Sequence, residues 1–339
     1  MIKTITCPIC QRRCSLADGQ IGFCQTKINR KGKLFSANYG LIQGIQIDPI
    51  EKKPFFHFRP GSLVPSIGSY GCNFRCKQCL NWWSSWGEPA KSTLEGVIKG
   101  NEASIISPKE LVEEIKKLGH QGIAFTYNEP TVWADYVLDV AKLAKKEKMF
   151  TVYVTNGSWS KETLDKIGPH LDAANVDLKG FSAETYARQG GFFGEIPAML
   201  AYAQKKHHIF LEITTLLIPT INDDQQELAE MTAWIVKNLG PQTPWHLSQY
   251  DPKLAPDKEF RKIPYTPTIQ MAEAAEIGRK SGLQFVYVWA PSSNYSQPNT
   301  NCPKCQNLAI QRTGYQVKIL GVDKKGHCSA CGEDLNIKG

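Results

Sequence analysis

Two kinds of hydrophobic pattern alternate through the middle of the chain: short apolar segments and longer amphipathic segments. Apolar, β-branched segments of strand length occur near residues 64–70, 122–127, 150–155, 172–178, 209–217, 245–249 and 283–288. Amphipathic segments of helix length lie between them, such as SPKELVEEIKKLG at 107–119, where Ser107 suits a cap and Pro108 suits the first turn. This alternation predicts repeated strand–helix units.

Repeated strand–helix units favour a parallel sheet. With about six units we predict an α/β fold, a partial (β/α)6 TIM-like barrel that is closed or nearly closed. A doubly wound open sheet is the alternative architecture. We predict three regions: an N-terminal cysteine-bearing region at 1–60, the barrel at 61–292, and a C-terminal extension at 293–339.

Polar side chains are concentrated where the predicted strands end. In a barrel of this kind the functional side chains gather at the carboxyl ends of the strands. One polar residue in a strand is often a core residue with its hydrogen bonds satisfied, and this reading stays open for Glu212 and His246. The candidates of this kind are Asn128, Glu129, Thr155, Asn156, Asp177, Lys179, Glu212 and His246.

Composition adds little to this picture. The chain has 339 residues, of which 42% are hydrophobic and 21% charged. No apolar run approaches the roughly 20 residues that span a bilayer, and the start, MIKTITCPIC, has no apolar signal core, so we expect a cytoplasmic protein without a membrane partner. The net charge of +8 includes a lysine-rich helix face around 142–148, which we interpret as solvated rather than as a nucleic-acid surface.

The eleven cysteines are more informative because they form three groups. Without a secretory signal, such groups favour metal binding over disulfides. The central group has the spacing CxxxCxxC, and three thiolates in a short loop can bind three corners of an iron–sulfur cube, which leaves the fourth iron open. A three-cysteine zinc site completed by a distant histidine is the alternative. The central group consists of Cys72, Cys76 and Cys79.

The two terminal groups each contain four cysteines. CPKC and CSAC near the C-terminus are separated by 22 residues, which predicts a zinc-ribbon-like or rubredoxin-like extension, with zinc favoured over iron. The N-terminal spacing is less regular; we predict a zinc-holding knuckle, with an auxiliary iron–sulfur cluster as the alternative. The ligands are Cys7, Cys10, Cys14 and Cys24 at the N-terminus, and Cys302, Cys305, Cys328 and Cys331 at the C-terminus.

Four segments carry a resemblance to a known family: DPIEKKPFFHFRPGS (48–62), SIGSYGCNFRCKQCLN (66–81), AFTYNEPT (124–131) and VDLKGF (176–181). The chain resembles the radical S-adenosylmethionine (SAM) enzymes related to pyruvate formate-lyase activating enzyme. Within them it is most similar to the radical SAM enzymes of the AmmeMemoRadiSam system.

The resemblance implies roles for the candidate residues. Cys72, Cys76 and Cys79 would hold a 4Fe-4S cluster whose open iron chelates SAM. Asn128 and Glu129 match the segment that meets the methionine amino group. Thr155 and Asn156, with Asp177 and Lys179, match positions that meet the ribose and the methionine carboxylate.

The resemblance also implies a function. An external one-electron donor of the flavodoxin or ferredoxin type would reduce the cluster, and cleavage of SAM would give methionine and a 5'-deoxyadenosyl radical. That radical would abstract hydrogen from an unidentified protein or small-molecule substrate. The alternatives are a nucleic-acid-binding protein whose fold is stabilised by bound metal, and a scaffold protein that does not cleave SAM.

Overall fold

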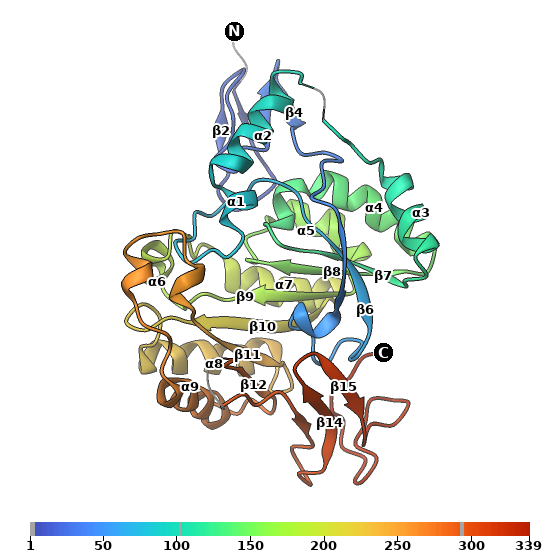
Figure 1. Ribbon diagram of the computed structural model, residues 1–339, viewed down its shortest axis with the longest axis vertical. Helices are drawn as coiled ribbons and strands as arrows, with labels where there is room; N and C mark the ends of the chain where they lie inside the picture. Colours follow the sequence, from blue (N-terminus) through green and yellow to red (C-terminus); the bar gives the residue numbers. More distant parts are fainter. Residues whose placement is uncertain (1–3, 102, 292–294) are drawn as a thin grey trace. The chain divides into compact units, whose positions relative to one another are not determined.

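The computed structural model describes residues 4–101, 103–291 and 295–339, and Figure 1 shows the course of the chain. The chain divides into two compact units. The first contains the residues up to Ile47, Val64–Ala174 and Gly190–Ile209; the second contains Asp48–Leu63, Asn175–Gln189 and Phe210–Gly339. This division differs from the three regions proposed from the sequence, and those regions stay a prediction.

The main sheet has eight strands in the order β12-β11-β10-β9-β8-β7-β6-β5. The strands are β5 (Ile45–Pro49), β6 (Leu63–Ile67), β7 (Gly122–Phe125), β8 (Phe150–Thr155), β9 (Ala173–Asp177), β10 (Phe210–Leu217), β11 (Trp245–Gln249) and β12 (Val286–Trp289). β6, β7 and β8 pair in parallel in the first unit, and β10, β11 and β12 do so in the second. The strand order follows the chain order, whereas a doubly wound sheet reverses its order at a switch point. The predicted α/β class with a sequentially ordered parallel sheet is confirmed.

Helices of the first unit follow its strands closely in sequence. They are α1 (Trp82–Ser85), α2 (Glu88–Ile98), α3 (Pro108–Lys117), α4 (Ala134–Lys146), α5 (Lys161–Ile167) and α7 (Ile196–His207). The predicted start of α3 is confirmed: Ser107 and Glu110 form a reciprocal capping box, and Pro108 is in the first turn. The buried residues of α3 are Leu111, Val112 and Ile115.

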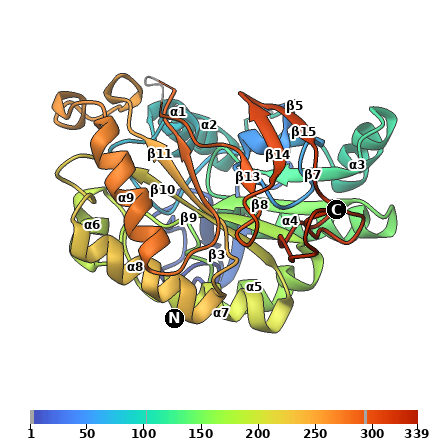
Figure 2. The same cartoon turned by 90° about the horizontal axis from the view of Figure 1, so that it is seen from below.

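Helices of the second unit are α6 (Ala183–Arg188), α8 (Gln225–Leu239) and α9 (Thr268–Lys280). Figure 2 shows α8 and α9 side by side, and the hydroxyls of Thr232 and Ser281 join them at 2.7 Å. α9 lies directly against β11, because a Cβ on Gly278 would come within 2.6 Å of the Trp245 ring. Glycine at that position permits the close approach.

Small antiparallel sheets carry the terminal cysteines. Near the N-terminus β1 (Ile5–Thr6) pairs with β2 (Ser15–Leu16), and β3 (Lys27–Arg30) pairs with β4 (Lys33–Ser36). Near the C-terminus β13 (Thr300–Asn301), β14 (Leu308–Thr313) and β15 (Gln316–Ile319) form a three-stranded sheet, drawn in red in Figure 1. The predicted C-terminal extension is therefore confirmed as a small β structure that carries a four-cysteine group.

Five of the seven predicted strands have different ends in the structure, and the two largest differences are at β6 and β12. β6 ends at Ile67 rather than at residue 70, because the chain at Ser69 already turns and donates its amide to the Asn128 side chain. β12 begins at Val286 rather than at 283, because the Leu283 amide still bonds to Gly278 after α9. Among the described helices, none is long and apolar enough to cross a membrane.

Candidate functional site

The cysteine loop begins directly after β6 and is held by Asn128. The side-chain oxygen of Asn128 accepts the Ser69 amide at 2.9 Å, and its side-chain nitrogen donates to the Gly71 carbonyl at 2.8 Å. Both ends of this amide therefore contact the loop backbone. Asn128, predicted from the resemblance to meet the cofactor, positions the cysteine loop in this structure.

Gly71 brings the loop into close contact with the N-terminal region. Its φ is +93°, in the left-handed region, and a Cβ there would lie 2.3 Å from Thr26 Cγ2 and 2.7 Å from the Cys24 carbonyl oxygen. No other residue fits this backbone conformation and this space together. The first cysteine of the loop, Cys72, is thus presented next to Cys24 in the fold.

The three loop thiols differ in exposure: Cys72 and Cys76 are buried, and Cys79 is half-buried. The Phe74 amide donates to Cys72 Sγ at 3.4 Å. Burial raises the pKa of Cys72 well above its usual value, and the charges of Cys76, Glu129 and Cys79 raise it further. The three thiols and the Glu129 carboxylate therefore share one neighbourhood.

The donor set of the loop fits a 4Fe-4S cluster better than a single metal ion. A single zinc ion takes four ligands, whereas a cube binds each thiolate at a different iron. The loop offers three thiols within eight positions, two of them buried and one half-buried. Three thiolates match a cube with one iron free.

Glu129 is a buried hydrogen-bonding centre at the start of the η2 turn (Pro130–Trp133). Its Oε1 accepts from the Thr131 amide at 3.0 Å and from the Thr131 hydroxyl at 2.5 Å. The same oxygen accepts from the Thr155 hydroxyl at 2.7 Å, and Oε2 accepts from the Asn156 amide at 2.7 Å. Burial raises the pKa of Glu129, and these hydrogen bonds lower it. A cationic ligand group would favour the charged form.

Asn156 connects the end of β8 to the cysteine loop. Its side-chain nitrogen donates to the side-chain oxygen of Asn73 at 2.9 Å, and its own oxygen accepts from the Ser158 amide and hydroxyl. Asn73 in turn donates to the Ser158 hydroxyl at 2.6 Å. The structure thus brings together five of the predicted elements of the site: the loop, Asn128, Glu129, Thr155 and Asn156.

The other predicted cofactor contacts lie in the second unit, in two separate groups. Lys179 Nζ is 3.2 Å from Oδ2 of Asp177, the last residue of β9. The second group is Glu212 on β10 and His246 on β11, whose side chains meet at 2.7 Å.

Glu212 and His246 belong to a buried polar cluster. The Glu212 carboxylate accepts the backbone amides of Phe56, His57 and Phe58 at 2.9–3.0 Å. Burial raises the pKa of Glu212, but the bond from His246 and the charges of His246 and His57 more than offset it and hold that pKa below its usual value. These contacts stabilise the segment 56–58, and a role of Glu212 and His246 toward a cofactor stays a prediction.

The four C-terminal thiols form a compact group. Cys302 and Cys331 Sγ atoms lie 3.6 Å apart, and those of Cys305 and Cys328 lie 3.7 Å apart. Tetrahedral zinc with Zn–S bonds of about 2.3 Å sets its sulfur atoms roughly 3.8 Å apart. The group therefore has the spacing of a single four-thiolate metal site, as the paired CxxC motifs predicted.

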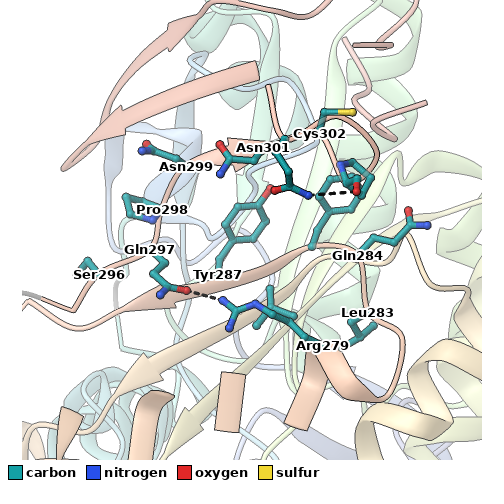
Figure 3. A pocket seen from close by; sticks show the side chains of 14 residues that line it. Arg279, Leu283, Gln284, Tyr287, Ser296, Gln297, Pro298, Asn299, Asn301 and Cys302 are labelled. Atoms are coloured by element: carbon teal, nitrogen blue, oxygen red, sulfur yellow. Dashed lines mark hydrogen bonds between the residues drawn. The ribbon is translucent and has the colours of Figure 1, made fainter. Parts of the chain in front are cut away.

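A cavity of about 610 Å³ lies beside this extension in the second unit (Figure 3). Its lining includes Arg279, which bonds to Gln297, together with Tyr287, Asn301 and Cys302. None of the predicted SAM contacts lines it. We therefore assign the candidate site to the cysteine loop rather than to this cavity.

Three residues that bond within or to the cysteine loop were not among the candidates from the sequence: Asn73, Arg12 and Arg75. The Arg12 side chain donates from Nε to the Asn73 carbonyl at 2.5 Å, and Arg75 donates to the Cys72 carbonyl at 2.6 Å. The only feature of the sequence that could have indicated these three residues is their position between the cysteines of a motif. Their roles depend on contacts between distant segments.

The chain is similar to several known proteins. The family model described as "Radical SAM superfamily" matches residues 66–232. An uncharacterized protein of Methanocaldococcus jannaschii is 34% identical over 334 residues, 98% of this chain and 95% of that protein. Another protein of that organism, provisionally named a glycyl-radical enzyme activating enzyme, is 25% identical over 65% of this chain and 87% of its own length. A crystal structure of a domain of pyruvate-formate lyase-activating enzyme from Bacteroides vulgatus is similar at 18% identity with a TM-score of 0.40, over 50% of this chain and 99% of that one.

Proposed function

The chain belongs to the radical SAM superfamily, and on that premise we propose that it cleaves SAM reductively at the Cys72 loop and abstracts hydrogen from a substrate. The family implies SAM and a 4Fe-4S cluster as cofactors. When bound, the cluster supplies one electron to the SAM sulfonium, which gives methionine and a 5'-deoxyadenosyl radical. The observation that carries the proposal is the hydrogen-bonded connection from the buried Glu129 carboxylate through Asn156 to Asn73, which follows the first cysteine of the three-cysteine loop.

The residues of the chain bind and orient the cofactors. Cys72, Cys76 and Cys79 would hold the cluster. Glu129 offers a negative charge to the methionine ammonium, and Thr155 and Asn156 hold that carboxylate in place. Asp177 and Lys179 are the proposed partners of the ribose hydroxyls and the methionine carboxylate. Burial of Glu129 and of two of the loop thiols keeps water from the reacting groups.

The C-terminal group is proposed to bind zinc and to act structurally. The segment 295–339 buries few large side chains, and its core includes Cys302, Cys328, Ile310 and Leu335. A small unit of this kind needs a metal or a disulfide to fold stably. Zinc does not change its oxidation state, so it would hold the extension without taking part in electron transfer.

The electron source and the substrate complete the proposal. The electron comes from an external one-electron donor protein of the flavodoxin or ferredoxin type. The name of one relative, a glycyl-radical enzyme activating enzyme, supports a partner protein as the substrate whose hydrogen is abstracted. A small-molecule substrate would use the same chemistry on the same site.

Electron paramagnetic resonance of anaerobically purified, dithionite-reduced protein tests the proposal. We expect a reduced-cluster signal that changes shape when SAM is added, because SAM binds the open iron. Cys76→Ala should lose this signal, and Cys305→Ala, which removes a C-terminal ligand, should keep it. A wild-type signal indifferent to SAM would contradict the proposal and would favour the scaffold or nucleic-acid-binding alternatives.

A further inference from the structure

The cavity of about 610 Å³ in the second unit lies between the edges of two sheets. One wall consists of residues 283–287, which lead into β12, the strand at one end of the main sheet. The other wall includes residues 296–299 and 301–303, which lead into and follow β13, the strand at one end of the small C-terminal sheet. Figure 3 shows side chains of both walls around the cavity. Its volume is typical of ligand-binding cavities, which measure about 300–1,000 Å³.

The cavity runs along the edge of β12 rather than over one face of the sheet. Successive side chains of a strand point to opposite faces, so a cavity on one face is lined by every second residue. Here consecutive residues line it: Gln284, Phe285, Val286 and Tyr287. The cavity is therefore placed where the backbone groups of an edge strand point.

The hydrogen bonds of β12 indicate which of its backbone groups point to that edge. The Trp245 amide of β11 donates to the Phe285 carbonyl at 3.0 Å. Val288 instead pairs on the other side: its amide donates to the Gln297 carbonyl at 3.3 Å, and its carbonyl accepts the Gln297 amide at 2.8 Å. Alternate residues of a strand direct their N–H and C=O groups to the same side. Val286 therefore directs both groups to the edge that the cavity follows.

The segment that pairs with Val288 turns away from β12 before it reaches Val286. Continued antiparallel pairing would place Asn299 opposite Val286. The side-chain oxygen of Asn299 instead accepts the Arg312 amide of β14 at 2.7 Å, and the Pro298 carbonyl accepts from the Arg312 side chain at 2.9 Å. A fork, formed by residues 283–287 and 296–303, therefore opens between the two sheets and contains the cavity.

An extended peptide has the shape and the backbone chemistry that this fork offers. Backbone N–H and C=O groups that are shielded from bulk water require hydrogen-bond partners. A peptide that adds to a strand edge supplies such partners, and the space beside the edge receives its side chains. The groups of Val286 provide the pairing position, next to the pairing already made by Val288.

The charge of the fork indicates the chemistry of such a peptide. Among the described residues that line the cavity, Arg279 is the only charged one. Its guanidinium donates to Gln297 Oε1 and lies 3.9 Å from the carboxylate of Glu276, which is not part of the lining. The other polar side chains include the amides of Asn301 and Gln284, which carry no charge. A carboxylate on the peptide would complement this guanidinium.

We propose that the fork binds an extended segment of a partner protein, with the segment's backbone paired to Val286 and an acidic side chain beside Arg279. The lining by consecutive residues, the direction of the Val286 backbone groups and the single positive charge carry the proposal. The inference concerns peptide docking and stands whether or not the chain cleaves SAM.

Hydrogen exchange of the full chain, without added peptide, tests the open edge. The Val286 amide should exchange about tenfold faster than the Val288 amide, which bonds to Gln297. Equal protection of the two amides would overturn the proposal, because it would show that the edge at Val286 is already paired.

Selection of short peptides from a random display library on the full chain tests the occupant. Selected peptides should combine β-branched residues with Asp or Glu, and their binding should protect the Val286 amide from exchange. Arg279→Gln should weaken binding of a selected acidic peptide about fivefold, measured by fluorescence anisotropy. Lys280→Gln is the matched control, because Lys280 is the next residue, is exposed and does not line the cavity.

Three results would overturn the proposal. One is the absence of selected peptides whose binding protects Val286, and another is equal binding by Arg279→Gln and wild type. Displacement of the bound peptide by free glutamate with equal affinity would assign the cavity to a small anion instead. A wild-type dimer that Arg279→Gln abolishes, detected by sedimentation, would assign it to a second copy of this chain and would equally reject a partner protein.

Discussion

Asn156 donates from its side chain to the side-chain oxygen of Asn73 at 2.9 Å, which joins the end of β8 to the residue that follows the first cysteine of the loop. The same Asn156 donates its backbone amide to Glu129. Hydrogen bonds therefore connect the proposed ammonium-binding carboxylate to the proposed cluster ligands. The geometry of SAM relative to the cluster should depend on this connection.

A double-mutant cycle tests the connection. Asn73→Ala, Asn156→Ala and the double variant should show a coupling free energy of unfolding of about 1 kcal/mol, as expected for one hydrogen bond between buried groups. Each single variant should also weaken SAM binding, measured by calorimetry. Gln226→Ala, at an exposed position of α8, is the control and should change neither quantity. Additive single effects would show that the two amides do not act together.

Gly71 provides a test of the close contact beside Cys72. Gly71→Ala should destabilise the chain by about 1 kcal/mol for the left-handed φ and by about 1–3 kcal/mol more for the collision with Thr26 and Cys24. Gly119→Ala is the matched control, because Gly119 has a φ of +77° and nothing within 4 Å of a built Cβ. Denaturant unfolding measures both variants. Equal losses for the two would contradict the proposed packing.

The pH dependence of stability should contain a contribution from Glu51. Burial raises the pKa of Glu51 to about 7, while the Gly61 amide and Arg312 lower it and Glu212 raises it. The folded state then holds a proton that the unfolded state has released between pH 4.5 and pH 7, so stability falls as pH rises through this window. Relative to Glu51→Gln, the unfolding free energy of wild type should fall by about 3 kcal/mol.

Denaturant unfolding of both proteins across this window gives that difference directly. Burial also lowers the pKa of His57, to about 4, and this acts in the opposite direction in both proteins. The comparison cancels it. A difference that does not vary with pH would show that Glu51 has an ordinary pKa.

The proposed C-terminal zinc should stabilise the extension. Cys328→Ala should lose one zinc per chain, because it removes one of four ligands, and the region 295–339 should be cleaved by protease about tenfold faster or more. Ser329→Ala, one residue away and exposed, is the control. Full zinc retention by Cys328→Ala would contradict the assignment of this group as the metal ligands.

The limits of a strand could be predicted from the sequence where its side chains pack on both faces of the sheet. β8 and β11 have the predicted limits, because their apolar runs are bounded by turn residues and helices. The paired CxxC motifs likewise predicted a compact group, since two local turns bring the sulfur atoms together. In each case the determining interactions are local in the chain.

The parts that the sequence did not predict depend on contacts between distant segments. Asn128 has the residue type of a ligand contact, yet it bonds the loop backbone around Gly71. For Glu212 the sequence left a core role open beside a site role but did not identify its partners, which are three amides from the segment 56–58. Asn73 was not among the candidates from the sequence, yet its side chain bonds to Asn156 and Ser158. Residue type and spacing do not encode such pairings.

Product analysis of SAM cleavage tests the central claim most directly. Anaerobically reconstituted protein, reduced with dithionite and given SAM, should form 5'-deoxyadenosine and methionine. Cys76→Ala should form neither above the protein-free background, and Cys305→Ala should retain cleavage. Absence of both products from wild-type protein that carries a full iron–sulfur complement would contradict the assignment of the Cys72 loop as a SAM-cleaving site.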